Sequence, residues 1–172
     1  PCFQETTLRN FVRAFVFPIA LACAFGAAMP TAADVTSAGH SFTPPEGFTL
    51  KQDGALTRVT APEGDATVTL ADIANAKDAD DAITQAWALA EAGFKRKLEL
   101  ATARASRNGW ADVKVYDYET SPNEKLAIQA TARRSTTSGG WVVILLQASQ
   151  ATLEKRGAPI GKFLTTLRPK GY

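Results

Sequence analysis

The chain has 172 residues and a formal net charge of +2, from 19 Lys and Arg against 17 Asp and Glu. This near balance lacks the basic excess of a nucleic-acid-binding domain. The only two cysteines, Cys2 and Cys23, both precede residue 34. The rest of the chain therefore has no disulfide, and its composition argues against a zinc site.

The first 33 residues are predicted to be a secretory signal peptide. Arg9 and Arg13 supply the positive start, residues 14–29 are uncharged and mostly apolar, and residues 31–33 supply small side chains for cleavage. A membrane-spanning helix is the alternative, but it needs ~20 apolar residues, and this shorter run contains Pro18. We expect an exported protein, periplasmic or secreted, that meets a membrane only through an uncleaved signal.

Cleavage after Ala33 would leave 139 residues, 172 minus 33, with a net charge of about +1. A domain of that size buries about two-thirds of its unfolded surface, which is enough for a core. The predicted organisation is a disordered segment at 34–41, a single domain at 42–168 and the start of a linker at 169–172. Because the chain starts without methionine, we hypothesise a piece of a longer reading frame. A stop codon directly after Tyr172 would contradict this.

Three short strands are predicted before the first helix, at residues 49–52, 55–61 and 66–73. The turn signals between them are Asp53-Gly54, which is typical of a two-residue hairpin, and the proline-containing stretch 62–65. Alternating apolar and polar residues in the third strand indicate one buried face.

The spacing of apolar residues then changes to three or four, which predicts an amphipathic helix from Ala79 to Phe94. Asp78 is the expected N-cap, with Asp81 three residues later in the capping-box position. Gly93 and the basic residues 95–97 mark the other end of the helix. The helix end explains these charges better than a binding patch does.

Four more strands are predicted at residues 98–106, 110–119, 125–136 and 141–147, with Asn-Gly at 108–109 as a strong hairpin signal. In the third of them, alternation places Leu126, Ile128, Ala130 and Ala132 inward, and Gln129, Thr131 and Arg133 outward. The fourth has six consecutive apolar residues, which is typical of a strand covered on both faces. We therefore expect it at the centre of the sheet.

A final helix is predicted from the spacing of Leu153, Gly157, Ile160, Leu164 and Leu167. Ser149 or Thr152 is the expected cap, and Pro159 is expected to kink or restart the helix. The predicted fold class is α+β, with order β-β-β-α-β-β-β-β-α and a mostly antiparallel sheet of about six or seven strands packed by two helices.

The sequence carries no recognisable catalytic or metal-binding set. The one histidine, His40, lies in the segment expected to be disordered and is interpreted as solvated, so no nucleophile has a rigid base beside it. No Ser-x-x-Lys motif and no cofactor-binding motif occurs. The acidic residues that could form a catalytic acid pair are Asp72, Asp78, Asp80, Asp81, Asp117 and Glu119. Their positions at helix caps and strand ends explain them better than such a pair does. We expect no catalytic residues, metal or cofactor.

Three aromatic residues of the 110–119 strand are the candidate partner-contacting surface: Trp110, Tyr116 and Tyr118. Trp and Tyr are enriched in interface hot spots. The alternative is that they are half-buried beneath a helix.

The run from Gly109 to Glu124 resembles the N-terminal segment of some exported bacterial serine hydrolases of the β-lactamase family. Residues 154–158 and 169–172 are similar too, and the resemblance covers residues 42–172. It implies an accessory segment that precedes a catalytic domain. No catalytic residue is carried over, because the serine-lysine motif of those enzymes has no counterpart here.

The element order is also similar to the PsbP/Mog1-like α/β sandwich, which is used as a binding or assembly module. Two functions follow as hypotheses. One is a non-catalytic accessory domain that packs on or positions a serine-hydrolase domain in the same polypeptide. The alternative is a free-standing periplasmic binding or assembly module. An enzyme in its own right is a third and weaker alternative, because no nucleophile-base pair is present.

Overall fold

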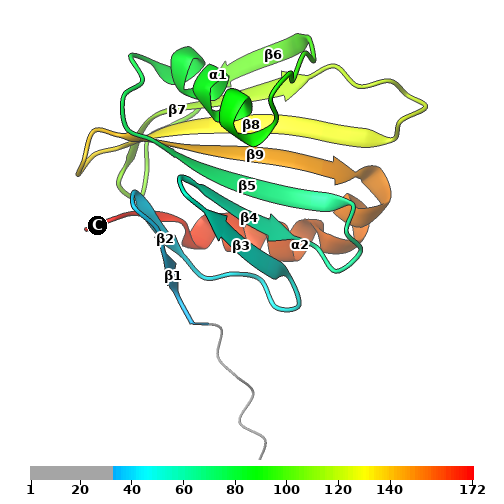
Figure 1. Cartoon of the computed structure of the whole chain (residues 1–172), viewed down its shortest axis with the longest axis horizontal. Coiled ribbons are helices and arrows are strands. Elements are labelled where there is room, and N and C mark those ends of the chain that lie inside the picture. Colours follow the sequence, from blue (N-terminus) through cyan, green and yellow to red (C-terminus); the bar gives the residue numbers. More distant parts are fainter. Residues whose placement is uncertain (1–32) are drawn as a thin grey trace, which may run out of the picture. The chain divides into compact units, whose positions relative to one another are not determined.

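A computed structural model describes residues 33–172 of the chain (Figure 1). The predicted signal peptide lies outside the described residues except for Ala33. The strands are β1 (Val35–Thr36), β2 (His40–Phe42), β3 (Thr49–Asp53), β4 (Leu56–Thr60), β5 (Ala66–Ile73), β6 (Leu98–Ala103), β7 (Trp110–Tyr118), β8 (Leu126–Ser135), β9 (Trp141–Ser149) and β10 (Arg168–Pro169). The helices are α1 (Ala79–Ala90) and α2 (Gln150–Thr166).

Seven strands form one antiparallel sheet in the order β3-β4-β5-β9-β8-β7-β6. The strand predicted to be central, β9, is the fourth of the seven and pairs with β5 on one side and β8 on the other. The α+β class, the two helices and the antiparallel sheet are confirmed.

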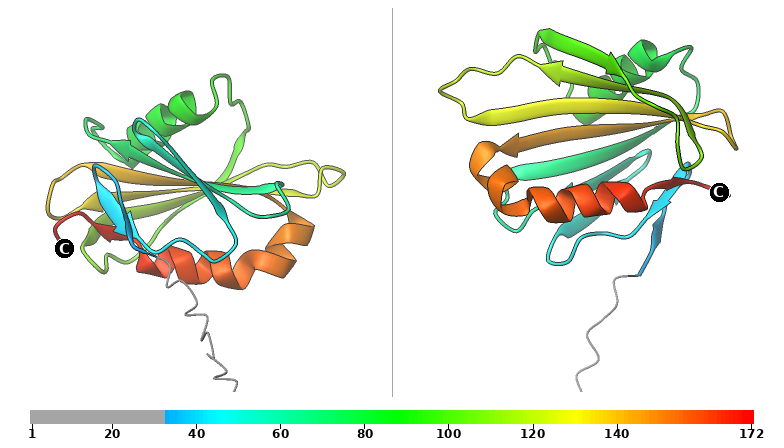
Figure 2. Two further views of the ribbon diagram at one scale, coloured as in Figure 1. Left: turned by 60° about the horizontal axis from the view of Figure 1, so that its bottom comes forward. Right: turned by 180° about the vertical axis from the view of Figure 1, so that it is seen from behind.

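The two helices cover opposite faces of this sheet (Figure 2, left). Successive residues of β9 point to opposite faces, as the pleat of a strand requires. Trp141, Val143 and Leu145 pack in the cluster that includes Ile83 and Trp87 of α1. The intervening Val142 and Ile144 pack in the cluster that includes Ile160 and Phe163 of α2. Both faces of β9 are buried, and this explains why its residues 141–146 are all apolar and do not alternate with polar ones.

Strand β7 carries a bulge that changes which of its residues face α1. Its pairing with β8 shifts between Ala111 and Lys114, and Asp112 has a φ of 47°. Trp110 therefore faces the α2 side with Val113, whereas Tyr116 faces the α1 side. Without the extra residue, strict alternation would place Trp110 and Tyr116 on the same face.

Both helices begin at the predicted caps. Asp78 accepts a hydrogen bond from the Asp81 amide at 2.9 Å, and Ser149 accepts one from the Thr152 amide at 3.1 Å. Helix α1 stops at Ala90, so Phe94 lies beyond it, although the ring still stacks on Trp87 with centroids 3.7 Å apart. Helix α2 is continuous through Pro159, so the helix does not restart there.

The two ends of the described chain pair with each other. Strands β1, β2 and β10 form a separate three-stranded antiparallel sheet, in which Pro169 is opposite His40. The Lys170 amide also donates to the Gly39 carbonyl at 3.0 Å. The segment 34–41, predicted to be disordered, is therefore ordered, and residues 169–170 belong to the domain and not to a linker. Their partners lie at the opposite end of the sequence, so no local pattern predicts the pairing.

None of the helices within residues 33–172 is both long enough and apolar enough to cross a lipid bilayer.

Candidate functional site

Helix α2 covers only part of its face of the sheet (Figure 2, right). Its apolar residues pack in a cluster with residues of β2, β4, β5, β9 and the first half of β7. Between its C-terminal half and strands β7 and β8 lies an open pocket of about 590 Å³. Volumes of this order are typical of sites for small molecules. The pocket is lined by Arg104, Ala105, Arg107, Asn108, Trp110, Val113, Val115, Gln129, Thr131, Arg133, Gly161, Leu164, Thr165, Leu167 and Arg168.

Four arginines line this pocket, which we call the arginine pocket. Arg104 and Arg107 come from the connection between β6 and β7, Arg133 from β8 and Arg168 from β10. Of the residues that the structure describes, no acidic one lines it. Arg168 also donates to the carbonyls of Thr165 and Leu167 at the end of α2, at 2.6 and 3.0 Å. The arrangement concentrates positive charge without a neutralising carboxylate.

Arg133 is the least compensated of the four. Its Nε is fully enclosed, and no hydrogen-bond partner for it is found among residues 33–172. Burial, together with the charges of Arg107 and Arg168, lowers the pKa of Arg133 to about 10. The guanidinium remains protonated at neutral pH, so it is a partly buried cation with no counter-ion among residues 33–172. Such a group is costly unless something pairs with it.

Three arginines outside this pocket are paired with carboxylates. Arg96 contacts Glu124 at 2.7 Å, Arg156 contacts Glu63 at 2.8 Å, and Arg134 contacts Asp112 at 2.5 Å. Arg134 is the next residue to Arg133 but points to the other face of β8, since neighbouring strand residues alternate. Arg58, also outside the pocket, donates to the Ala90 carbonyl at 3.2 Å. What distinguishes the arginine pocket is that it gathers four arginines with no carboxylate in its lining.

The remaining wall of the arginine pocket is largely apolar. It includes Val113 and Val115 of β7 and Leu164 of α2. Trp110 is only 3% exposed and donates its indole N–H to the Leu167 carbonyl at 3.2 Å, which fixes the end of α2 against β7. The β7 bulge makes this contact possible, because it turns Trp110 toward α2.

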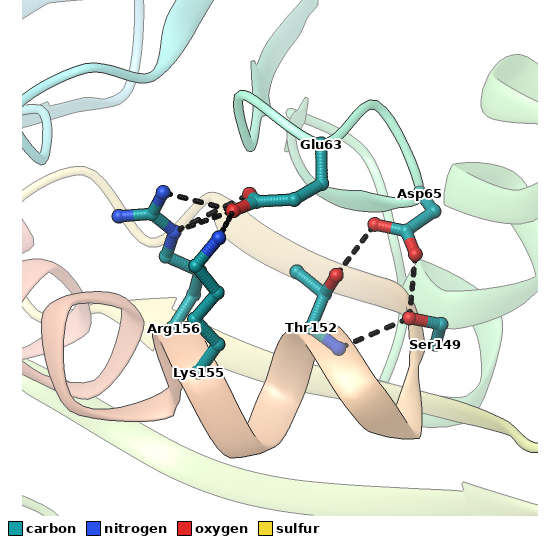
Figure 3. Close-up of polar contacts among 6 residues, drawn as sticks. All are labelled: Glu63, Asp65, Ser149, Thr152, Lys155 and Arg156. Carbon is teal, nitrogen blue, oxygen red and sulfur yellow. Dashed lines mark hydrogen bonds and ion pairs between the residues drawn. The ribbon is translucent and has the colours of Figure 1, made fainter.

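A second polar cluster fastens the turn between β4 and β5 to the start of α2 (Figure 3). Asp65 accepts hydrogen bonds from the hydroxyls of Ser149 and Thr152, each at 2.6 Å. Glu63 pairs with Lys155 at 2.6 Å and with Arg156 at 2.8 Å. Every charged group drawn in Figure 3 has a partner, so this cluster is explained by helix capping and ion pairing.

His40 is buried, so its interpretation as a solvated residue is wrong. Its Nδ1 lies 2.7 Å from Asp72 Oδ1 and 2.7 Å from the Ser37 hydroxyl, which also donates to Asp72 Oδ2 at 2.9 Å. A catalytic triad needs the serine and the acid on different ring nitrogens. Here both lie at Nδ1, and within the described chain Nε2 has no partner. The three side chains therefore do not have the geometry of a triad.

The aromatic residues proposed from the sequence do not share a surface. Trp110 and Tyr116 are each 3% exposed and lie on opposite faces of the sheet. The Tyr116 hydroxyl donates to Asp80 at 2.6 Å, and the Tyr118 hydroxyl accepts from the Trp87 indole at 3.0 Å. The half-buried alternative is the one that matches their positions.

The acidic and basic residues singled out in the sequence lie in local pairs. Asp80 contacts Lys114 at 2.9 Å, and Lys97 contacts Glu119 at 2.6 Å. Asp117 accepts from the Gln129 amide at 2.7 Å. No group of three or more His, Cys, Asp or Glu suited to a metal ion occurs in the part of the chain that was described.

Sequence reasoning missed the arginine pocket. Gln129, Thr131 and Arg133 were predicted to share the outward face of their strand, and they do line one wall. Residues 104–107 carry two further arginines beside a turn. The signal was an arginine on an otherwise uncharged strand face, but only the pairing of β7 with β8 and the path of α2 bring the four together.

No protein-family model matches this chain. No curated protein matches it either. Among solved structures, the chain is similar to the solution structure of cyanobacterial PsbP (CyanoP) from Synechocystis sp. PCC 6803, with a TM-score of 0.57 and 13% sequence identity. The match covers 87% of this chain and 98% of that chain. At this identity the likeness concerns the fold alone. The resemblance to serine-hydrolase accessory segments gains no support from these comparisons. The chain has a PsbP-like fold, as its element order predicts.

Proposed function

We propose that this protein is an exported, non-catalytic binding module that holds an anionic ligand in the arginine pocket. The observation that carries the proposal is Arg133, whose Nε is enclosed and unpartnered among the described residues and whose neighbours Arg107 and Arg168 are also cations. A PsbP-like fold is compatible with a binding module but does not by itself assign one.

The physical argument concerns the cost of the unpaired charge. Enclosing a guanidinium removes part of its hydration, and the two like charges of Arg107 and Arg168 oppose its protonation. An anion would restore hydrogen bonds to Arg133 and neutralise its neighbours. Charge-assisted bonds of this kind are worth roughly 1.5–3 kcal/mol each. Binding should therefore draw its free energy mainly from this one residue.

A phosphate titration tests the proposal. The Arg133 Nε–H resonance is followed by NMR as inorganic phosphate replaces chloride at constant ionic strength, so that general screening stays unchanged. A saturable shift is expected at Arg133. Arg133→Met should weaken phosphate binding about tenfold or more, from the loss of a charge-assisted bond.

Arg134→Met is the matched control, because Arg134 adjoins Arg133 in sequence and pairs with Asp112 on the other face. It should bind phosphate like the unmodified protein. Equal responses to chloride and phosphate, or equal losses in the two variants, would contradict the proposal.

A more specific function is that the domain positions a serine-hydrolase domain in the same polypeptide. Its only support is the resemblance of residues 109–124 to the N-terminal segment of such hydrolases. It is tested by expressing the domain with and without its downstream sequence. Turnover of nitrocefin or p-nitrophenyl esters is expected only with the downstream sequence. Turnover by the isolated domain would contradict the non-catalytic part of the proposal.

A further inference from the structure

We infer that the ligand of the arginine pocket is an amphiphile with one anionic head and one apolar body, rather than an inorganic anion. The inference rests on the proposed function and specifies its ligand. Three features support it: the size of the pocket, the apolar side chains that line it beside the arginines, and a carboxylate, that of Asp117, just outside its far end.

The size of the pocket exceeds what a small anion fills. Its volume of about 590 Å³ corresponds to about 20 water molecules at the liquid share of about 30 Å³ each. A single phosphate or sulfate at Arg133 would leave most of this space to water. A larger ligand that covers the apolar wall would displace that water and gain the associated free energy.

Apolar side chains line the pocket both beside the arginines and farther along β7: Val113 lies at the bulge opposite Arg133, and Val115 lies two residues farther on. Arg133 lies near the end of β8, opposite the start of β7, and Arg107 precedes that start. Moving away from the arginines, Thr131 is opposite Val115, and Gln129 is opposite Asp117. From Arg133 to Gln129 the strand advances about 13 Å, four residues at about 3.3 Å each. This is room for a chain extending from a head bound at Arg133.

Beyond Val115 the same face carries one further apolar side chain, that of Leu100, beside the polar Asp117 and Gln129. Leu100 of β6 is opposite Asp117, so it lies on the face that carries Val115, and it is 55% exposed. Helix α2 does not reach this part of the sheet (Figure 2, right). An alkyl or aryl body lying along β7 would cover these side chains.

Asp117 limits the far end to a neutral group. Its carboxylate accepts from Gln129 at 2.7 Å, at the end of the path that starts at Arg133. A second anionic head placed there would meet a like charge, which disfavours a dianionic ligand with a charge at each end. The pocket therefore fits a ligand charged at one end only.

Calorimetric titrations with small amphiphiles test the inference. The probes are inorganic phosphate, octyl phosphate, octanoate and octanedioate, at pH 7 and equal ionic strength. Octyl phosphate, octanoate or both should bind at least tenfold more tightly than inorganic phosphate. Octanedioate should bind at least threefold more weakly than octanoate because of Asp117. Which head is preferred distinguishes a phosphate ester from a carboxylate, and either supports the amphiphile.

Two variants test separately the contacts with the anionic head and with the apolar body of the ligand. Val115→Ser should weaken binding of the octyl probe at least threefold and leave inorganic phosphate unchanged, whereas Arg133→Met should weaken both. Leu89→Ser is the matched control, since Leu89 is 55% exposed on α1, on the other face of the sheet. Circular dichroism verifies that each variant is folded.

The outcomes are distinguishable. Phosphate binding that depends on Arg133 but gains nothing from the octyl chain would overturn the amphiphile and leave the proposed function standing. No binding of any probe would overturn both. An octyl effect that Leu89→Ser removes as strongly as Val115→Ser would also overturn the inference, because the chain would then lie elsewhere.

Discussion

Nδ1 of His40 lies 2.7 Å from Oδ1 of Asp72, and this contact joins β2 of the small terminal sheet to β5 of the main sheet. Burial raises the pKa of the Asp72 carboxyl, but the hydrogen bond and charge of His40, together with the Ser37 hydroxyl, outweigh it. The net pKa of Asp72 lies below its ordinary value. Gly39 is required beside it, because a Cβ there would lie 2.5 Å from the same Oδ1.

This relationship predicts a specific loss of stability in acid. A carboxyl whose folded-state pKa is depressed stabilises the fold above its ordinary pKa, and this contribution is lost as the pH falls through the folded-state value. Asp72→Asn should cost about 1–3 kcal/mol at pH 7, because it disrupts a buried polar pair. Its free energy of unfolding should also depend less on pH between 7 and 3. Urea denaturation at several pH values measures both. Asp53→Asn, in the exposed β3, is the control, and an equal effect there would contradict the prediction.

The turn before β7 is predicted to depend on Gly109 for two reasons. Its φ is 78°, and a Cβ would lie 2.5 Å from the Tyr172 ring and 2.7 Å from Pro169. Gly139 has a similar φ of 76° but open space around it. Gly139→Ala should cost about 1–2 kcal/mol from backbone strain alone, and Gly109→Ala should cost clearly more. Chemical denaturation of both variants compares them. Equal losses of stability in the two variants would show that Pro169 and Tyr172 can move away from the added methyl group without loss of free energy.

Ser149 is predicted to matter for α2 through its cap. Its hydroxyl oxygen accepts from the Thr152 amide at 3.1 Å while its O–H donates to Asp65 at 2.6 Å. Ser149→Ala removes both contacts and should lower the free energy of unfolding by about 1 kcal/mol. Ser106→Ala, in the exposed connection between β6 and β7, should have little effect. Thermal unfolding followed by circular dichroism measures the difference, and indistinguishable midpoints would count against the cap.

Glu63 is predicted to titrate far below the ordinary pKa of a glutamate. The hydrogen bond from Arg156, followed by that from Lys155, lowers the pKa of Glu63 to about 2. The ion pairs should therefore persist down to about pH 2 and be lost below it, which is the sign expected for a depressed carboxyl. Carbon-detected NMR titration of the Glu63 carboxyl measures the midpoint.

Arg156→Gln should raise the pKa of Glu63, and Arg134→Gln should not, because Arg134 pairs with Asp112. Concentrated salt should also raise the pKa of Glu63, since exposed pairs are screened. A midpoint near the ordinary glutamate value in the unmodified protein would show that these contacts do not persist in solution.

The arginine pocket and the positions of the aromatic residues could not be predicted from the sequence. The period of two along residues 110–118 predicted that Trp110 and Tyr116 share a face. One extra residue at Asp112 reverses the phase, and the sequence carries no strong signal for such a bulge. The contacts of Trp110 with α2 and the position of the pocket both follow from it.

The sequence by itself determined the seven strands of the main sheet, the two helices and the place of residues 141–146, because periodicity, caps and turn residues are local properties of the chain. Which face each strand shows on either side of a bulge, the burial of His40 against Asp72, and the gathering of Arg104, Arg107, Arg133 and Arg168 were decided only by the tertiary structure. These contacts join segments far apart in sequence. Their free energy depends on which groups share a buried space, and no local pattern encodes that.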